Sequence, residues 1–499
     1  MKQIHVRLDD AGGVPMPKPV LESVYASDLE FEPQERRQRI LPDGTVELTV
    51  SGEPYMIHAK INLPLYGNIW VMADNEGAGY TGDFVDFVTE ACRTYIREAE
   101  KYGESLSLSP GHLSPETLGH LAAAREFSHL ANRGKTTPEN RLYALSHAVY
   151  AAEAALFEAA RQRLYASPRE DLLLGCNFFR YTSSEARYAK FFAKAFDFAT
   201  LPFYAGRTVP ERGKYTYEYI DKALEFLQSK KIIPKGHPIW FGHGDVNPKW
   251  LFGQSFETLQ GYAREIARHH AGTYKGRIGI WDAMNEAHDW ANCFMLTQSQ
   301  LTELTRTCCD ALHETDSAAA AVVNVCLPFA EYVAGRYVCY GSLPEKLRSP
   351  LAYFRAILEA GVQFDVTGIQ LYFPARDMVA VDRMLSIFAS LGKPVHITEM
   401  GVNGGLRGQG SSNGSSWMQL SMSEGVWHGG WNERTQADWM EQFYTIAAAH
   451  REIKALTWWD FIEPSFSGNG AFLYEDENPR EIYFRLLALK ERIIQKNRT

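Results

Sequence analysis

From about residue 170 onward, short apolar runs alternate with stretches in which apolar residues recur every three or four positions. The first pattern is typical of buried parallel strands, and the second of amphipathic helices that cross over between them. Eight such runs predict strands: Leu172–Asn177, Phe196–Phe203, Pro238–His243, Ile278–Asn285, Ala320–Val325, Val366–Phe373, Val395–Met400 and Ala455–Phe461. Eight strand–helix units predict an α/β fold, a (β/α)8 barrel.

The chain before residue 170 follows different patterns. Polar and apolar residues alternate in Thr45–Val50 and Tyr55–Leu63, which predicts a β-rich module over residues 1–80. Helical spacing then predicts a helical connector over 81–168, and the barrel would occupy 169–499. The module is interpreted as a structural cap on the barrel, with carbohydrate binding as the alternative.

Charge and cysteine content narrow the function classes. The formal charge is -9 and Lys and Arg form no long stripe, so neither nucleic acid nor a membrane is an expected partner. Because the N-terminus lacks an apolar leader and no apolar run could span a bilayer, the chain as given is expected in the cytoplasm. If an apolar leader precedes this sequence, the protein is expected to be secreted instead. The seven cysteines show no metal-binding spacing and are interpreted as buried thiols, so neither a metal nor another cofactor is expected.

Two of the predicted strands end in a glutamate. Glu286 follows the run that begins at Ile278, and Glu399 closes the run that begins at Val395. A single glutamate at a strand end is more often a solvated loop residue or a helix cap. In a parallel barrel, however, the carboxyl ends of the strands share one face, where two carboxyl groups can flank one glycosidic bond. The pair therefore predicts glycoside hydrolysis.

The segments around these glutamates resemble known motifs. Trp281–Ala287 resembles the acid/base motif Trp-Asp-Val-Val-Asn-Glu-Ala of the family 10 glycoside hydrolases, the endo-β-1,4-xylanases, and Ile397–Met400 is similar to their nucleophile motif Ile-Thr-Glu-Leu. Further similar segments are Pro210–Tyr217 with Asp221, Gly368–Gln370 and Thr457–Trp459. The resemblance covers residues 170–495 and implies a retaining hydrolase with Glu286 as the acid/base and Glu399 as the nucleophile.

The resemblance also implies roles for neighbouring residues. Asn285 would bind the 2-hydroxyl of the sugar that is cleaved, and Gln370 would contact or orient Glu399. Trp459 would form an apolar wall under that sugar, with Trp458 beside it. Tyr372 stands where the family has a histidine, and would donate a hydrogen bond to the nucleophile.

The sequence departs from the family where the non-reducing sugar would bind. The family's Glu-Asn-x-x-Lys-Trp segment is missing after the second strand, where Tyr204 or Arg207 would replace the lysine. His243 is a shifted counterpart of a sugar-binding histidine. His243 and Asp245 could instead be metal ligands, but without a second cluster we interpret both as sugar contacts.

A long connection after Glu399 carries Trp417, Trp427, His428 and Trp431, and is interpreted as a lid or wall of the substrate cleft. The sequence therefore predicts cleavage of β-1,4-linked xylan or a related, decorated plant β-glycan, so that a polysaccharide or oligosaccharide is the expected partner. The alternatives are an intracellular enzyme acting on oligosaccharides or a different β-glycan, and a catalytically silent carbohydrate-binding protein.

Overall fold

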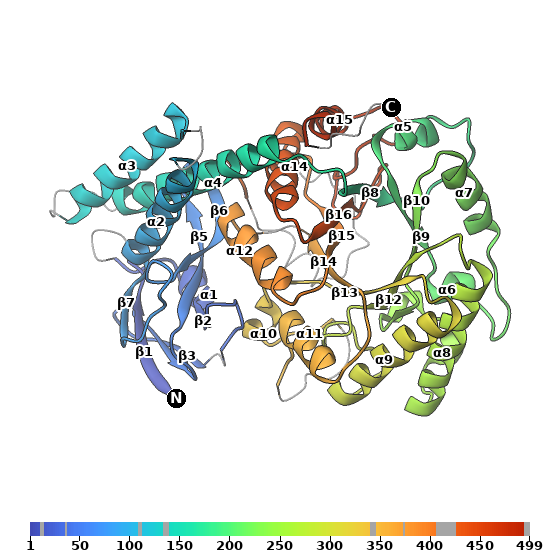
Figure 1. Cartoon of the computed structure of the whole chain (residues 1–499). Helices are drawn as coiled ribbons and strands as arrows, with labels where there is room; N and C mark the ends of the chain where they lie inside the picture. Colours follow the sequence, from blue (N-terminus) through green and yellow to red (C-terminus); the bar gives the residue numbers. More distant parts are fainter. Residues whose placement is uncertain are drawn as a thin grey trace.

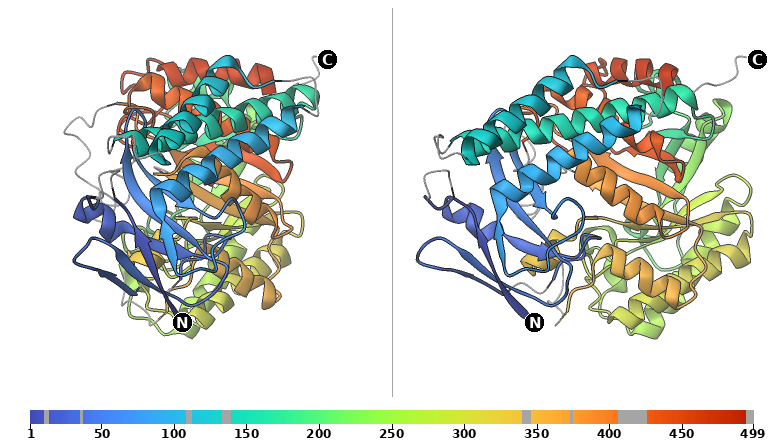
Figure 2. Two further views of the ribbon diagram at one scale, coloured as in Figure 1. Left: turned by 90° about the vertical axis from the view of Figure 1, so that its left-hand side faces the viewer. Right: turned by 60° about the vertical axis from the view of Figure 1, so that its left-hand side comes forward.

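A computed structural model describes residues 1–9, 14–34, 37–107, 112–132, 139–339, 346–372, 375–405 and 426–493. Figure 1 shows two regions side by side: N-terminal strands with three long helices on the left, and a barrel on the right. Turning the molecule shows the long helices lying across the N-terminal strands and reaching the barrel (Figure 2).

The N-terminal module contains two small sheets. One has the strand order β3-β4-β1-β7 and the other β2-β5-β6. The elements are β1 (Lys2–Arg7), α1 (Lys18–Ser23), β2 (Tyr25–Ser27), β3 (Arg37–Ile40), β4 (Val46–Val50), β5 (Met56–Leu63), β6 (Gly67–Ala73) and β7 (Phe84–Asp86). Alternate residues of β4 are buried, as the alternating pattern requires. Strands continue to Asp86, a few residues beyond the expected end of the module.

Three helices follow: α2 (Phe87–Ser107), α3 (Pro115–Asn132) and α4 (Glu139–Ala166). Helix α4 packs along α2 and α3 and also contacts barrel helices α12 and α14. Buried alanines line α4, including Ala148, Ala152, Ala155 and Ala159. Small side chains at helical spacing allow the neighbouring helices to approach closely.

The remaining chain forms the predicted (β/α)8 barrel. Its elements are β8 (Leu173–Asn177), α5 (Arg187–Ala195), β9 (Phe198–Pro202), α6 (Ala205–Thr208), α7 (Glu218–Ser229), β10 (Ile233–His237), β11 (Trp240–Phe241), η1 (Gly244–Val246), η2 (Lys249–Leu251), α8 (Phe256–Thr273), β12 (Ile280–Asn285), α9 (Gln298–Thr315), β13 (Ala320–Val325), α10 (Glu331–Gly335), α11 (Pro350–Glu359), β14 (Val366–Tyr372), α12 (Met378–Ala389), β15 (Val395–Gly401), α14 (Glu433–Ala449), β16 (Ile453–Trp458) and α15 (Glu481–Ile493). Parallel pairing runs β10-β9-β8-β16-β15-β14-β13-β12, and β10 closes the ring on β12.

The third barrel strand differs from its prediction. The strand is β10, residues Ile233–His237, whereas Pro238–His243 contributes only the short β11, which pairs with β12. The polar side chains of Lys235 and His237 interrupt the apolar pattern and concealed this strand. Both side chains are nevertheless buried, because they point into the barrel.

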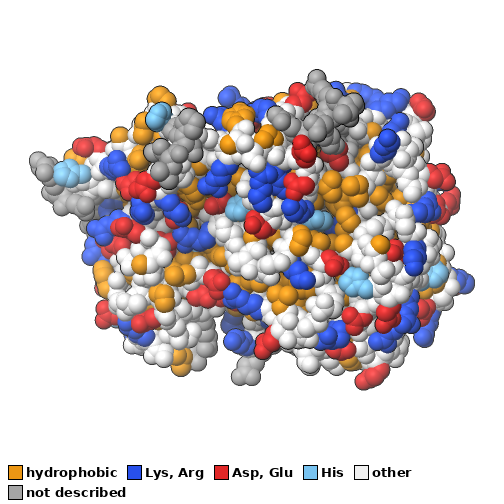
Figure 3. Space-filling view, viewed as in Figure 1, with side chains coloured by type: hydrophobic (Ala, Val, Ile, Leu, Met, Phe, Trp, Pro, Cys, Tyr) orange, Lys and Arg blue, Asp and Glu red, His pale blue; other side chains and the backbone are white. Residues whose placement is uncertain are grey.

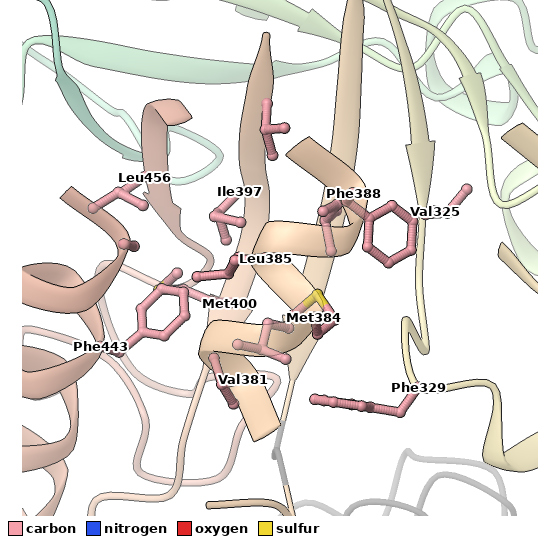
Figure 4. Close-up of a cluster of buried hydrophobic side chains, with 14 of the residues drawn as sticks. Val325, Phe329, Val381, Met384, Leu385, Phe388, Ile397, Met400, Phe443 and Leu456 are labelled. Carbon is pink, nitrogen blue, oxygen red and sulfur yellow. The ribbon is translucent and has the colours of Figure 1, made fainter. Parts of the chain in front are cut away.

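The core between the strands and the outer helices is apolar. Figure 4 shows the inward face of α12 against the strands; the labelled side chains are Val325, Phe329, Val381, Met384, Leu385, Phe388, Ile397, Met400, Phe443 and Leu456. These residues come from α12, α14, three strands and, for Phe329, the segment after β13, so that one cluster fixes the helices to the strand that carries Glu399.

The N-terminal module is attached to the barrel through buried charge. Arg376, just after β14, is 1% exposed and donates hydrogen bonds to Tyr25 Oη (2.6 Å), His58 Nδ1 (3.1 Å) and Glu331 Oε1 (2.9 Å). Its guanidinium lies 5.4 Å from the ring centre of Trp70 in β6. The residue follows the carboxyl end of a strand, so the module contacts the barrel near the face where strand ends meet.

On the outer surface, Lys, Arg, Asp and Glu side chains lie interspersed over the face shown in Figure 3. Among the described helices, none combines the length and the apolar character needed to cross a bilayer.

Candidate active site

The two glutamates lie at the carboxyl ends of barrel strands. Glu286 directly follows β12 with a positive φ of 56°, a conformation uncommon for a residue with a side chain. Its backbone N–H donates to Asn324 O at 2.7 Å, which holds this turn in place. Glu399 lies within β15 and is 5% exposed. Both carboxyl groups therefore occupy the face of the barrel at which catalytic residues are found in this fold.

A row of side-chain amides connects the two carboxyl groups. Asn324 Nδ2 donates to Glu399 Oε1 at 3.0 Å and to Asn285 Oδ1 at 2.7 Å. Gln370 Nε2 donates to Glu286 Oε1 at 2.9 Å and approaches Asn285 Oδ1 at 3.4 Å. Asn285 thus lies between the glutamates, joined to both by neighbouring amides. The register pairs Gln370 with Glu399, but its amide is directed to Glu286, in contrast to the role expected from the sequence.

Sequence reasoning missed Asn324, which Thr398 Oγ1 orients by donating to its Oδ1. Both residues are buried, on β13 and β15, the two strands that flank β14. A polar residue inside the apolar run Ala320–Val325 was the available signal, because such a side chain needs a partner when it is buried.

Burial raises the pKa of both glutamates to about 7. For Glu399, burial is the largest cause, His237 acts against it, and the charge of Glu286 adds to it. Tyr372 also lowers the pKa, since its hydroxyl donates to Glu399 Oε2 at 2.9 Å. For Glu286, burial is opposed by hydrogen bonds from Gln370, Cys326 and Asn285. One of the pair can thus stay protonated near neutral pH while the other ionises.

The adjacent tryptophans at the end of β16 face different environments. Trp459 is 8% exposed, and its ring contacts His237 edge to face, with centroids 5.3 Å apart. Trp458 is fully buried, donates to Gly470 O at 2.9 Å and packs against Trp439 of α14. Because side chains alternate along a strand, Trp458 points to the helices, in contrast to the substrate contact expected from the sequence.

The residues expected to bind the sugar on the non-reducing side differ in how deeply they are buried. Tyr204 contacts His237 edge to face at 5.4 Å, and burial followed by the charges of Glu399 and Glu286 raises its pKa. Arg207 is exposed on α6. His243 is half-buried, with its pKa lowered by burial, and its Nδ1 accepts from the Asp245 N–H at 3.2 Å. The carboxyl group of Asp245 faces solvent. Within the part of the chain that the structure describes, no cluster of His, Cys, Asp and Glu could hold a metal.

The described end of the long connection contacts the N-terminal regions. Trp427 is 2% exposed, its indole N–H donates to Glu153 Oε1 of α4 at 3.3 Å, and His428 stacks on its ring. Trp431 is half-buried, 6.3 Å from Trp427 between ring centres. Trp427 therefore has almost no exposed ring surface for a sugar. Trp417 lies outside the described residues.

Comparison with known proteins agrees with this architecture. The profile of Glycosyl hydrolase family 10 matches residues 183–487. Endo-1,4-beta-xylanase B of Thermotoga neapolitana is 25% identical over 304 residues, which cover 56% of this chain and 76% of that protein.

Endo-1,4-beta-xylanase 3 of Arabidopsis thaliana is 24% identical over 61% of this chain, but the match spans only 36% of the plant protein. The structure of xylanase 10B from Thermotoga petrophila in complex with xylobiose shares 20% identity at a TM-score of 0.49, covering 68% of this chain and 97% of that one. Because the family profile matches more than half of the sequence, this chain belongs to glycosyl hydrolase family 10.

Proposed function

We propose that the protein is a retaining glycoside hydrolase that cleaves β-1,4-linked xylan or a related plant β-glycan. The observation that carries this proposal is the unequal bonding of two linked carboxyl groups. Glu399 accepts hydrogen bonds on both oxygens, from Asn324 and Tyr372. These bonds stabilise a carboxylate, as a nucleophile requires, whereas Glu286 can retain its proton as a general acid.

Two displacements follow from this arrangement. In the first, Glu399 attacks the anomeric carbon while Glu286 gives its proton to the departing glycosidic oxygen. In the second, Glu286 takes a proton from a water molecule whose oxygen attacks the anomeric carbon, so that Glu399 leaves as a carboxylate and the sugar keeps its original configuration. In this proposal Asn285 binds the 2-hydroxyl of the same sugar, and its links to both carboxyl groups through neighbouring amides support this role.

The test replaces each glutamate separately and assays the variants on a panel of defined β-glycans. Glu286→Ala and Glu399→Ala should each lose at least about a hundredfold in kcat/KM, because each removes a group that acts in the transition state. Azide should partly restore the activity of Glu286→Ala on an activated substrate, because azide attacks the glycosyl-enzyme without the help of a general base. Glu257→Ala, on the exposed first turn of α8, is the matched control.

The stereochemistry separates the mechanisms. NMR of the first product should show the β-anomer, and an initial α-anomer would exclude double displacement. If the folded wild type binds β-glycans without cleaving any of them, the silent carbohydrate-binding alternative is correct.

The substrate is proposed to carry side groups. The family's sugar-binding lysine is absent, and the exposed Arg207 does not restore a buried charged contact, which would contribute about 1.5–3 kcal/mol. Aromatic stacking on the half-buried Trp431 could compensate. We therefore expect a higher kcat/KM on decorated than on linear xylo-oligosaccharides, and a smaller ratio in Trp431→Ala. A wild type that favours the linear substrate would contradict this proposal.

A further inference from the structure

A thiol that the proposed mechanism does not use lies beside Glu286. Cys326 directly follows β13, is 7% exposed and forms a hydrogen bond with the Glu286 carboxyl group. Its Sγ also lies 3.5 Å from Nε2 of His288, a fully buried ring two residues after Glu286. The thiol thus contacts both the proposed acid/base and a histidine that is shielded from solvent.

The pairing of neighbouring strands explains why the thiol reaches Glu286. The Glu286 N–H donates to Asn324 O at 2.7 Å, so the end of β13 runs beside this residue. Side chains alternate along an extended chain, so Asn324 and Cys326 point to one side, whereas Val325 between them joins the apolar cluster of Figure 4. The end of β13 therefore presents one donor to each carboxyl group, the Asn324 amide to Glu399 and the thiol to Glu286.

The hydrogen bonds of His288 determine where the thiol proton points. The backbone N–H of Cys326 can only donate, and it donates to His288 Nε2 at 3.3 Å. Burial lowers the pKa of His288 to about 3, so near neutral pH the ring is uncharged and carries its proton on Nδ1, which donates to Tyr332 Oη at 2.9 Å. Because the Nε2 lone pair is already engaged, the Glu286 carboxyl group is the better acceptor for the S–H.

A thiol suits a carboxyl group that acts first as an acid and then as a base. Burial, followed by the charge of Glu286, raises the pKa of Cys326, so the thiol keeps its own proton and adds no charge to the carboxyl pair. A bond from this neutral donor stabilises the ionised form of Glu286 and opposes the effect of burial. Because a thiol is a weak donor, this stabilisation is small, and Glu286 still has a pKa of about 7.

We propose that Cys326, oriented by His288, is a positioning residue that donates its S–H to Glu286 and stabilises the carboxylate formed when Glu286 protonates the leaving group. The same carboxylate is the base that the second displacement requires. This inference rests on the proposed role of Glu286 as the acid/base. Removal of the thiol should therefore change how readily Glu286 ionises, while the other bonds of the site remain.

Other ionisable groups near Glu286 affect how its titration is measured. Glu399 titrates in the same range, so the two carboxyl groups lose their protons in two steps that belong to the pair. Tyr204 and Cys339 also lie near Glu286, and burial raises the pKa of each above its ordinary value. The charge of Arg348 acts on the histidine and helps to keep its ring neutral. The upper of the two steps therefore reports Glu286 beside an ionised Glu399.

The first experiment measures kcat/KM against pH on a β-glycan oligosaccharide, whose leaving sugar needs a proton, so that the basic limb reports Glu286. In Cys326→Ala this limb should move up by about half to one pH unit, the shift expected on losing one weak hydrogen bond to a carboxylate. Cys326→Ser retains a donor, so its limb should return towards that of the wild type. An unmoved limb in Cys326→Ala, or an equal shift in both variants, would overturn the inference.

The matched control is Cys308→Ala. Cys308 lies on the outer helix α9 and is fully buried, and burial alone raises the pKa of its thiol. This variant removes the same atoms from the interior away from the carboxyl groups, so its pH profile should match that of the wild type. A shift as large as that of Cys326→Ala would show that a buried cavity moves the limb, and would overturn the inference.

The second experiment needs neither turnover nor a cysteine variant. The S–H stretching band in the infrared falls in frequency when the thiol donates to a stronger acceptor, so part of this band should shift as Glu286 ionises. The shift should vanish in Glu286→Gln. A responsive band in a protein whose Glu286→Ala variant stays fully active would contradict the proposed function and leave the hydrogen bond in place. An unresponsive band in a protein whose Glu286→Ala variant is inactive would overturn the inference alone.

Discussion

At the scale of single residues, the carboxyl pair is built at the expense of stability. Burial raises the pKa of Glu286 from the ordinary 4.5 to about 7, so folding disfavours its charged form. A carboxyl group whose pKa is raised in the folded state is most favourable below the unfolded pKa. Its contribution is lost as the pH rises through the folded value. The wild-type protein should therefore lose stability between about pH 4.5 and pH 7 at this position.

Replacing Glu286 by glutamine tests this cost. Glu286→Gln removes the charge but keeps the shape, and should be more stable than the wild type at pH 8 by about 3 kcal/mol. The advantage should disappear at pH 4, where the wild-type carboxyl group is protonated in both states. Thermal unfolding at the two pH values measures it, with Glu257→Gln as the exposed control. An equal difference in Tm at both values would contradict the assignment.

The residues that the sequence revealed and those that it concealed differ in one physical respect. Glu286 and Glu399 stand at the ends of apolar runs, where a polar residue is conspicuous. Asn324 lies inside β13 and His237 ends β10, and both side chains meet partners on strands distant in the sequence. No local pattern encodes such a pairing, because it depends on the barrel register. For the same reason, the direction of the Gln370 amide could not be predicted.

At the scale of elements, β10 was predicted at the wrong residues because its buried polar side chains interrupt the apolar pattern expected of a barrel strand. β10 ends in lysine, glycine and histidine, whereas the apolar residues that follow it have the pattern expected of a buried strand. The other strands could be predicted to within a few residues because their interiors are almost wholly apolar. A strand that contributes charges to an active site loses the signature by which strands are recognised.

Another element-scale feature is the fastening of the segment after β15 to β6. The N–H of Val426 donates to Asn68 O at 3.0 Å, and the N–H of Gly429 to Tyr66 O at 2.7 Å. Gly67 has a φ of 135°, and a side chain there would meet Val426 O at 2.3 Å. This close approach joins the chain that follows the nucleophile strand to the N-terminal module.

Glu153 of α4 holds this junction and offers a test. Its Oε1 accepts from Tyr66 Oη at 2.8 Å and Met378 N at 2.7 Å, and its Oε2 bonds His428 Nε2 at 2.9 Å. Glu153→Ala leaves several buried donors unpaired and should lower the free energy of unfolding by about 3 kcal/mol or more. Urea denaturation measures the loss, with the exposed Glu126→Ala of α3 as the control. A change as small as that of the control would show that water replaces the carboxylate.

At the scale of the whole molecule, the N-terminal regions pack against the barrel through a buried interface. Helix α2 donates from Tyr95 Oη to Asp377 and from Tyr102 Oη to Asp382, at the start and within the first half of α12. Arg383 of the same helix bonds the buried Asp74 at 2.7 Å. These contacts place polar groups of both parts in one buried interface, where each depends on the other for its partners.

The barrel alone should therefore be unstable. A chain that begins at residue 168 would expose α12 and leave Arg376 without Tyr25 and His58. We expect it to aggregate or to unfold at a Tm well below that of the whole chain, because an unpaired buried charge is costly. Scanning calorimetry and size-exclusion chromatography measure this. A soluble barrel with an unchanged Tm would contradict the structural role of the module.

The buried guanidinium of Arg376 also bears on how such a protein can be altered or recombined. A binding unit on a linker can be exchanged between enzymes because the parts share no interior. Here the interface between module and barrel contains the charge of Arg376, whose partners come from both parts. A module moved to another barrel would therefore have to place Tyr25, His58 and Trp70 around an equivalent arginine. We therefore expect the two parts to be exchangeable only together, and a substitution among these partners on one side to require a matching change on the other.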